Sequence, residues 1–180
     1  MRSFLLIKAQ PGSELEVQRR LKALSEVREI HLITGKFDLL VTLESEEADL
    51  DPRRKIAELV IETVRREGGI LDTRTIIPIS SRYNRPAKAD RPTVKAFVFI
   101  QTEAGKESEL VNKLLEVEDV VGVHLLFGKA DILAELDTEK SLVDPPPQHV
   151  ATIVESKISK LSGVRDTDTY VPLESIMKNQ

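Results

Sequence analysis

The sequence predicts an α+β protein built from two copies of one small domain, and two observations support this prediction. The segment that starts at Phe4 returns 93 positions later (97 − 4) at Phe97, and a His-Leu-x-x-Gly-Lys-x-Asp pattern occupies both 31–38 and 124–131. The same order of strand and helix signals also occurs in both copies. Because a solenoid unit spans only a few tens of residues, a repeat of this length indicates a duplicated domain.

Each copy reads as strand, helix, strand, strand, helix, strand. Alternating and helical apolar spacings in the first copy predict strands at 4–9, 27–34, 36–43 and 70–79, and helices at 14–24 and 52–67. Ser13 and Asp51 are the expected N-caps of the two helices, and Asp144 is the expected N-cap in the second copy. Gly35 is expected to supply the positive φ of a tight antiparallel hairpin.

The order βαββαβ is the ferredoxin-like arrangement, which carries its helices on one face of a four-stranded sheet. The other face should be polar if it met water, yet Phe4–Ile7, Leu39–Val41 and Val98–Ile100 are apolar at consecutive positions. We therefore expect the two sheets to pack face to face as an intramolecular pseudo-dimer of the dimeric α+β barrel type. The first repeat is placed at 1–81, a polar, proline-bearing linker at 82–92 and the second repeat at 93–180.

Composition excludes several classes of function. The net charge of −4 provides no basic surface for nucleic acid. The absence of cysteine excludes disulfides and thiolate chemistry, and with only three histidines we expect no metal site and no cofactor. The chain begins directly with a strand and has no apolar stretch of membrane-spanning length, so we expect a cytoplasmic protein.

Two short segments of the first copy carry a resemblance to a known family. Residues 34–41 form a strand–Gly–x–x–Asp–strand pattern, and 72–77 place two threonines on the closing strand. Together they resemble the effector-binding domain, or RAM domain, of the Lrp/AsnC transcription regulators, and 128–134 with 167–169 resemble it equally. Family regulators carry a helix-turn-helix before this module. Since the module starts here at residue 2, we expect no direct DNA binding.

The resemblance places an effector beside the glycine turn and the threonines of the last strand. The implied ligand-binding residues form one set in each copy: Gly35, Asp38, Thr73 and Thr75, and then Gly128, Asp131, Thr167 and Thr169. An aspartate would take the ammonium group of an amino acid, and threonine hydroxyls and backbone N–H groups would hold its carboxylate. The structural alternative is that the aspartates cap their hairpins and that the threonines are ordinary strand residues. Differences at Phe37/Ala130 and Arg74/Asp168 predict that the two sites are not equivalent.

The preferred function is a non-enzymatic sensor that binds a small molecule, in the first place an amino acid, and acts in transcriptional or metabolic regulation. Its expected partners are further copies of itself, as an oligomer of pseudo-dimers, and a DNA-binding regulator. The sequence shows no nucleophile–His–acid motif and no phosphate-binding loop, so no catalytic residue is assigned. Two alternatives stay open: a ligand-free assembly module, and a small barrel-type enzyme using His31 or His124 as base or axial ligand. The structural interpretation of these mid-strand histidines is a core or interface role.

Overall fold

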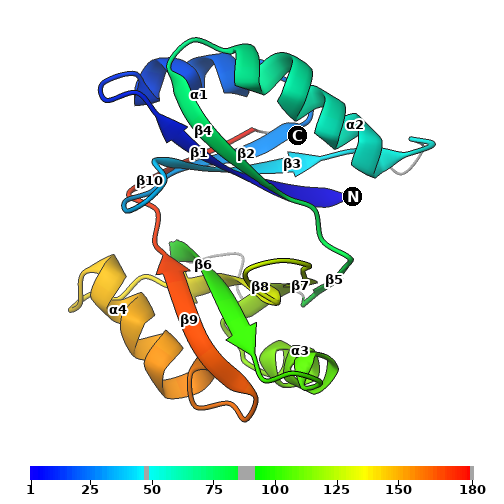
Figure 1. Ribbon diagram of the computed structural model, residues 1–180. Helices are drawn as coiled ribbons and strands as arrows, with labels where there is room; N and C mark the ends of the chain where they lie inside the picture. Colours follow the sequence, from blue (N-terminus) through cyan, green and yellow to red (C-terminus); the bar gives the residue numbers. More distant parts are fainter. Residues whose placement is uncertain (47–48, 85–91, 179–180) are drawn as a thin grey trace. The chain divides into compact units, whose positions relative to one another are not determined.

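The structure is a computed structural model that describes residues 1–46, 49–84 and 92–178 (Figure 1). Its contacts divide the chain into two compact units. Unit 1 comprises Met1–Ile77 with Pro172–Gln180, and unit 2 comprises Pro78–Val171. Each unit contains a five-stranded antiparallel sheet, and the predicted order βαββαβ is present in both copies. The α+β, ferredoxin-like character of the two repeats is therefore confirmed.

Unit 1 has the strand order β10-β2-β3-β1-β4. Its strands are β1 (Arg2–Ala9), β2 (Val27–Leu32), β3 (Leu39–Glu44), β4 (Ile70–Ile76) and β10 (Glu174–Met177). Its helices are α1 (Glu14–Lys22) and α2 (Pro52–Glu58), and α2 continues as a π-helical turn, η1 (Leu59–Thr63), and a 3-10 turn, η2 (Val64–Arg66). Figure 1 shows α1 and α2 over one face of this sheet.

Unit 2 has the strand order β5-β7-β8-β6-β9. Its strands are β5 (Ser80–Tyr83), β6 (Thr93–Thr102), β7 (Val120–Leu125), β8 (Ile132–Glu139) and β9 (Val164–Tyr170). Its helices are α3 (Glu107–Leu115) and α4 (Pro146–Ile153), and α4 continues as a π-helical turn, η3 (Val154–Ile158). The π turn after the second helix occurs in both copies, so it is a property of the repeat.

The core of each unit lies between the helices and one face of the sheet. In unit 1, Leu5 and Ile7 of β1 pack in one cluster with Val17 and Leu21 of α1. Each such side chain, fully buried, contributes about 1.5–3 kcal/mol relative to exposure. Phe4, on the opposite face of β1, is buried as well, which agrees with the apolar pattern on both faces. Face-to-face packing of the two sheets stays a prediction.

The fifth strand of each sheet comes from the end of the other repeat. β10, near the C-terminus, pairs with β2, with Ser175 opposite His31. β5, at the end of the first repeat, pairs with β7, with Ser81 opposite His124. The structural units therefore differ from the order of the repeats in the sequence, because each closing segment adds to the other repeat's hairpin. Residues 85–91 of the predicted linker lie outside the described residues.

The segment around Gly35 is antiparallel as predicted, but the tight turn is wrong. β2 ends at Leu32 and β3 begins at Leu39, so a longer connection replaces the predicted tight turn at Gly35. The backbone N–H of Asp38 donates to Ile7 O at 2.9 Å, which holds this connection against β1. Gly35 has a φ of 115° and Gly128 a φ of 147°, so the predicted positive φ is confirmed.

The predicted helix caps have mixed outcomes. Asp51 is confirmed, because its side chain accepts from the backbone N–H of Arg54 at 3.1 Å. Ser13 stands at the N-cap of α1, but its side chain makes no capping hydrogen bond. The Asp144 cap is wrong, since the run of prolines moves the N-cap of α4 to Pro145.

The closing strand of the first copy, β4, is shorter than the predicted range 70–79, because it ends at Ile76.

None of the helices in the described part of the chain combines the length and the apolar character that a transmembrane helix needs.

Removing β10 by truncation after Leu173 is expected to destabilise unit 1. The truncation leaves β2 without its outer neighbour and removes Ser175, whose hydroxyl lies 2.8 Å from the buried ring of His31. A buried polar atom that loses its partner costs about 1–3 kcal/mol. Urea unfolding followed by circular dichroism measures the loss, and Ser175→Ala separates the side chain from the strand. An unchanged unfolding midpoint in the truncated protein would rule out a stabilising role for β10.

Candidate functional site

The first predicted site residue, Asp38, lies directly before β3 and binds the end of β1. Its Oδ2 accepts from the backbone N–H of Ala9 at 2.8 Å, and its Oδ1 lies 3.0 Å from Nζ of Lys8. The carboxylate therefore secures the connection between β2 and β3 to the central part of the sheet. The ammonium group of Lys8 therefore forms an ion pair with the Asp38 carboxylate within the chain.

Asp131, the equivalent residue of the second copy, has the same structural role with different partners. Its Oδ2 accepts from the backbone N–H of Thr102 at 2.8 Å and faces the Thr102 hydroxyl at 3.3 Å. The position of Lys8 is taken by Gln101, which is 93 residues later. In the described part of the chain the Asp131 carboxylate thus receives neutral donors, whereas Asp38 also has an ammonium group.

The threonine pairs share a face, as the sequence predicts, and that face is the one covered by helices. Thr73 pairs with Ile7 and Thr75 with Leu5, and both of these partners belong to the helix-facing core. The Thr73 hydroxyl accepts from Nε of Arg65 at 2.8 Å, which joins η2 to β4. Thr73 therefore has an internal partner in the folded chain.

The second copy repeats this placement. Thr167 pairs with Ile100 and Thr169 with Val98, and both partners belong to the helix-facing core of unit 2. Asp131 donates its backbone N–H to Ile100 O from the other side of β6. The aspartate and the threonines thus flank the same stretch of strand, with their backbones about 10 Å apart, two strand spacings.

Gly35 and Gly128 are exposed within the two connections, and the residues around them differ between the copies. In the first copy Phe37 is buried, and the Arg74 guanidinium lies 5.4 Å from the centre of its ring. The equivalent positions of the second copy are Ala130 and Asp168. An aromatic ring and a cation of the first copy are therefore replaced by a methyl group and a carboxylate at the equivalent positions of the second copy.

Two buried histidines each bridge a serine and a glutamate through hydrogen bonds, and we call these two Ser–His–Glu groups the relays. The sequence alone did not predict these partners. The ring of His31 lies between Ser175 Oγ, 2.8 Å from Nδ1, and Glu29 Oε2, 3.0 Å from Nε2. The ring of His124 lies between Ser81 Oγ at 2.8 Å and Glu135 Oε1 at 2.6 Å. Both histidines are fully buried. The only signal in the sequence is that Ser81 and Ser175 are 94 positions apart, the spacing of the closing segments.

The carboxylates of the two relays come from different strands. Glu29 lies on β2, and its equivalent in the second copy, 93 positions later, is Gly122. A Cβ at Gly122 would lie 3.2 Å from Glu135 Oε1 and 3.3 Å from His124 Nε2. The glycine thus leaves room for Glu135 of β8 to reach the histidine. The chain has kept the Ser–His–Glu arrangement while changing the strand that supplies the acid.

Comparison with solved structures identifies proteins of similar fold. The siroheme decarboxylase NirDL aligns over 100% of this chain and 73% of its own, with a TM-score of 0.70 and 10% identity. At that identity the likeness concerns the fold alone. FFRP-DM1 is 29% identical over 43% of this chain and 97% of its own, with a TM-score of 0.39. The hypothetical protein PHS023 from Pyrococcus horikoshii is 26% identical over 48% and 92%, with a TM-score of 0.37.

A search of curated proteins found no match. A family model described as the Lrp/AsnC ligand binding domain matches twice, at residues 2–87 and 95–180. The two matches together span nearly all of the chain and coincide with the duplication seen in the sequence. The chain belongs to the Lrp/AsnC ligand-binding domain family and contains that domain in tandem.

Proposed function

We propose that this tandem protein is a non-enzymatic sensor of a small amino acid, and that its second copy is the binding copy. The family match supports a regulatory ligand-binding module. The observation that carries the choice of copy is the difference in charge beside the two aspartates. Asp38 has Lys8 at 3.0 Å, whereas Asp131 has hydrogen bonds from the Thr102 backbone and hydroxyl.

An amino acid needs an acceptor for its ammonium group and donors for its carboxylate. Oδ2 of Asp131 accepts both hydrogen bonds from Thr102, and in this proposal Oδ1 accepts from the ligand ammonium. A charge-assisted hydrogen bond of this kind is about twice as strong as a neutral one. The exposed backbone of Gly128 and the ammonium of Lys129 lie in the same connection and suit the ligand carboxylate. Thr167 and Thr169 lie on the helix-facing side of β9, and in this proposal they support that strand.

The enzyme alternative draws on the fold shared with the siroheme decarboxylase and on the two buried histidines. Both ring nitrogens of His31 and of His124 have partners within the chain. Use of either ring as a base or an axial ligand would require breaking one of these hydrogen bonds. This geometry favours a structural role for the histidines and a sensor function for the chain.

A thermal-shift panel of the common amino acids tests the proposal. A ligand present at 100 times its dissociation constant adds about 2.7 kcal/mol to the stability of the folded state. We expect one amino acid, or a chemically related group of them, to raise the melting temperature. A panel without any shift at millimolar concentrations would instead favour the ligand-free assembly module.

The sensor is expected to assemble further through its exposed sheet edges. β4 and β9 are outer strands of the two sheets, and such edges offer unpaired backbone groups to another chain. Leu71 on β4 is 64% exposed, which adds apolar surface at that edge. Light scattering should give a mass of at least twice 20.2 kDa. A 20 kDa species at high concentration, with and without amino acids, would contradict this assembly.

Direct binding to duplex DNA is not expected from this polypeptide. Affinity for DNA depends on lysine and arginine side chains that neutralise phosphates, and the net charge here is −4. A regulator with its own DNA-binding domain is therefore the proposed partner. Salt-sensitive binding of the pure protein to duplex DNA in an electrophoretic mobility assay would overturn this expectation.

A further inference from the structure

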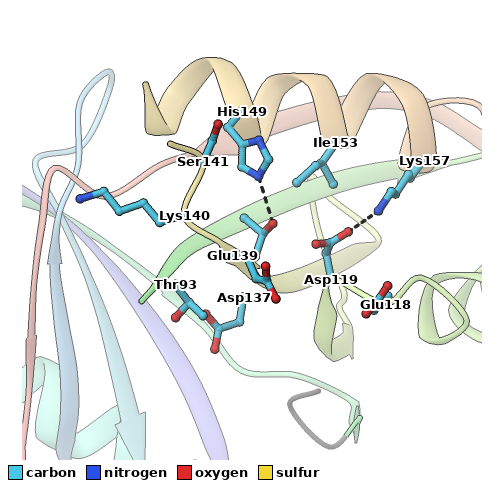
Figure 2. A pocket seen from close by; sticks show the side chains of 11 residues that line it. Thr93, Glu118, Asp119, Asp137, Glu139, Lys140, Ser141, His149, Ile153 and Lys157 are labelled. Atoms are coloured by element: carbon cyan, nitrogen blue, oxygen red, sulfur yellow. Dashed lines mark hydrogen bonds and ion pairs between the residues drawn. The ribbon is translucent and has the colours of Figure 1, made fainter. Parts of the chain in front are cut away.

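Unit 2 contains a pocket that is separate from the proposed amino-acid site. It encloses about 370 Å³ and lies where β7 begins and β8 ends, beside α4 and η3 (Figure 2). Asp131 stands before the start of β8, whereas Asp137 lines the pocket near the other end of that strand. The volume falls within the range of about 300–1,000 Å³ that is typical of small-molecule sites.

One carboxylate in the pocket is incompletely satisfied. Oδ1 of Asp137 is buried and has no hydrogen-bond partner among the residues that the structure describes. Burying a polar atom without a hydrogen bond is unfavourable, and nearly all such atoms in folded proteins have a partner. The described residues therefore supply no hydrogen-bond donor to Oδ1 of Asp137.

The first copy shows which donors belong at this position. The backbone N–H of Asp137 donates to Asp119 O at 2.9 Å, and the N–H of Glu44 donates to Glu26 O at 2.7 Å. Glu44 is thus the counterpart of Asp137. Its two carboxylate oxygens receive Arg2 and Arg28, each at 3.1 Å.

A lysine fills the adjacent space in the first copy. Nζ of Lys55 lies 3.1 Å from Asp49 and 3.9 Å from Glu26, the counterpart of Asp119. The hydrogen bond to Asp49 raises the pKa of the Lys55 ammonium, so this group stays charged. In unit 1 the carboxylates of Glu26 and Glu44 therefore have cations of the chain itself beside them.

The second copy keeps its carboxylates and a cation at the position of Arg2, which is Lys95, opposite Asp137 in the sheet, but it has lost the other two cations. The counterpart of Lys55 is His149, 94 positions later, and the counterpart of Arg28 is Val121, 93 positions later. Nε2 of His149 lies 3.3 Å from the Thr138 hydroxyl. Lys157, from η3, lies 2.6 Å from Asp119 (Figure 2), and Asp137 Oδ1 has no hydrogen-bond partner among the described residues.

From this internal comparison we infer that the pocket binds a small organic cation with a primary ammonium group. The ammonium takes the place that Lys55 and Arg28 occupy in the first copy and donates to Asp137 Oδ1. Lys140 also lines the pocket, but it is exposed and does not occupy the position of either lost cation. This site does not depend on the proposed amino-acid site, because the two lie at opposite ends of β8.

Titration calorimetry of the full chain with 1,4-diaminobutane tests the inference. We expect saturable binding with one molecule per chain, and a higher melting temperature than in NaCl of the same ionic strength. 1,4-Butanediol, which has the same length without the charges, should have no effect. Absence of saturable binding, or an equal effect of NaCl, would overturn the inference.

Two variants locate the site. Asp137→Asn removes the charge, and His149→Lys supplies the ammonium of the first copy from the chain itself; each should weaken binding about tenfold or more. Glu155→Gln is the matched control, because this exposed carboxylate on η3 does not line the pocket. If the affinity of His149→Lys for 1,4-diaminobutane stays within twofold of the wild-type value, the proposal is wrong. This variant tests the proposal even if Asp137→Asn fails to fold.

Discussion

Replacing His124 by alanine is expected to destabilise the protein, because it removes a fully buried ring and its hydrogen bonds to Ser81 and Glu135, each of which costs about 1–3 kcal/mol when a buried polar group loses it. Nε2 of His124 lies 2.6 Å from Glu135 Oε1, and the Glu135 side chain is only 7% exposed. The same change removes the hydrogen bond to Ser81, which joins β5 to β7. Urea unfolding of the variant measures the loss.

The first copy supplies the matched comparison. His31 is equally buried, but its acid, Glu29, has a side chain that is 14% exposed. Water can therefore solvate Glu29 more readily after His31→Ala, and we expect a smaller loss of stability than for His124→Ala. A loss below about 1 kcal/mol in both variants would show that the relays do not hold the added strands.

The second large effect is expected at Asp131. Replacement by asparagine keeps the shape of the side chain and the acceptor for Thr102, but it removes the charge that the ligand ammonium needs. Since a hydrogen bond to a charged group contributes about 1.5–3 kcal/mol, affinity for the amino acid should fall about tenfold to a hundredfold. Calorimetric titration with the amino acid selected by the thermal-shift panel measures this.

Asp38→Asn is the control for that prediction. Its carboxylate is engaged with Lys8 and the Ala9 N–H, so the change should affect stability rather than affinity. The Lys8–Asp38 pair is partly exposed, and such pairs contribute up to about 1 kcal/mol. A loss of affinity confined to Asp38→Asn would assign sensing to the first copy instead.

The fold was predictable because the relevant signals are local. The apolar spacing at Val17 and Leu21 determines a helix within a few residues, and the repeated glycine at 35 and 128 marks a connection with positive φ. The duplication then doubled each signal. Asp51 was predictable as a cap for the same reason, since its partner lies only three residues away.

The remaining features depend on partners that are distant in the sequence. Ser175 meets His31 across 144 positions, and nothing in the short segment Glu174–Met177 shows that β2 is its neighbour. The carboxylates of the two relays come from different strands, so a comparison of the repeats alone would miss the second. The unequal aspartates were predictable only in part, because the contrast between Lys8 and Gln101 requires knowing that β1 and β6 lie beside them.

The number of amino-acid molecules bound per chain tests the central claim most directly. If the second copy senses an amino acid through Asp131, calorimetry should give one molecule per chain with similar affinity in the wild type and in Asp38→Asn, and an affinity lower by about tenfold to a hundredfold in Asp131→Asn. Two equivalent molecules per chain, or an unchanged affinity in Asp131→Asn, would contradict the account.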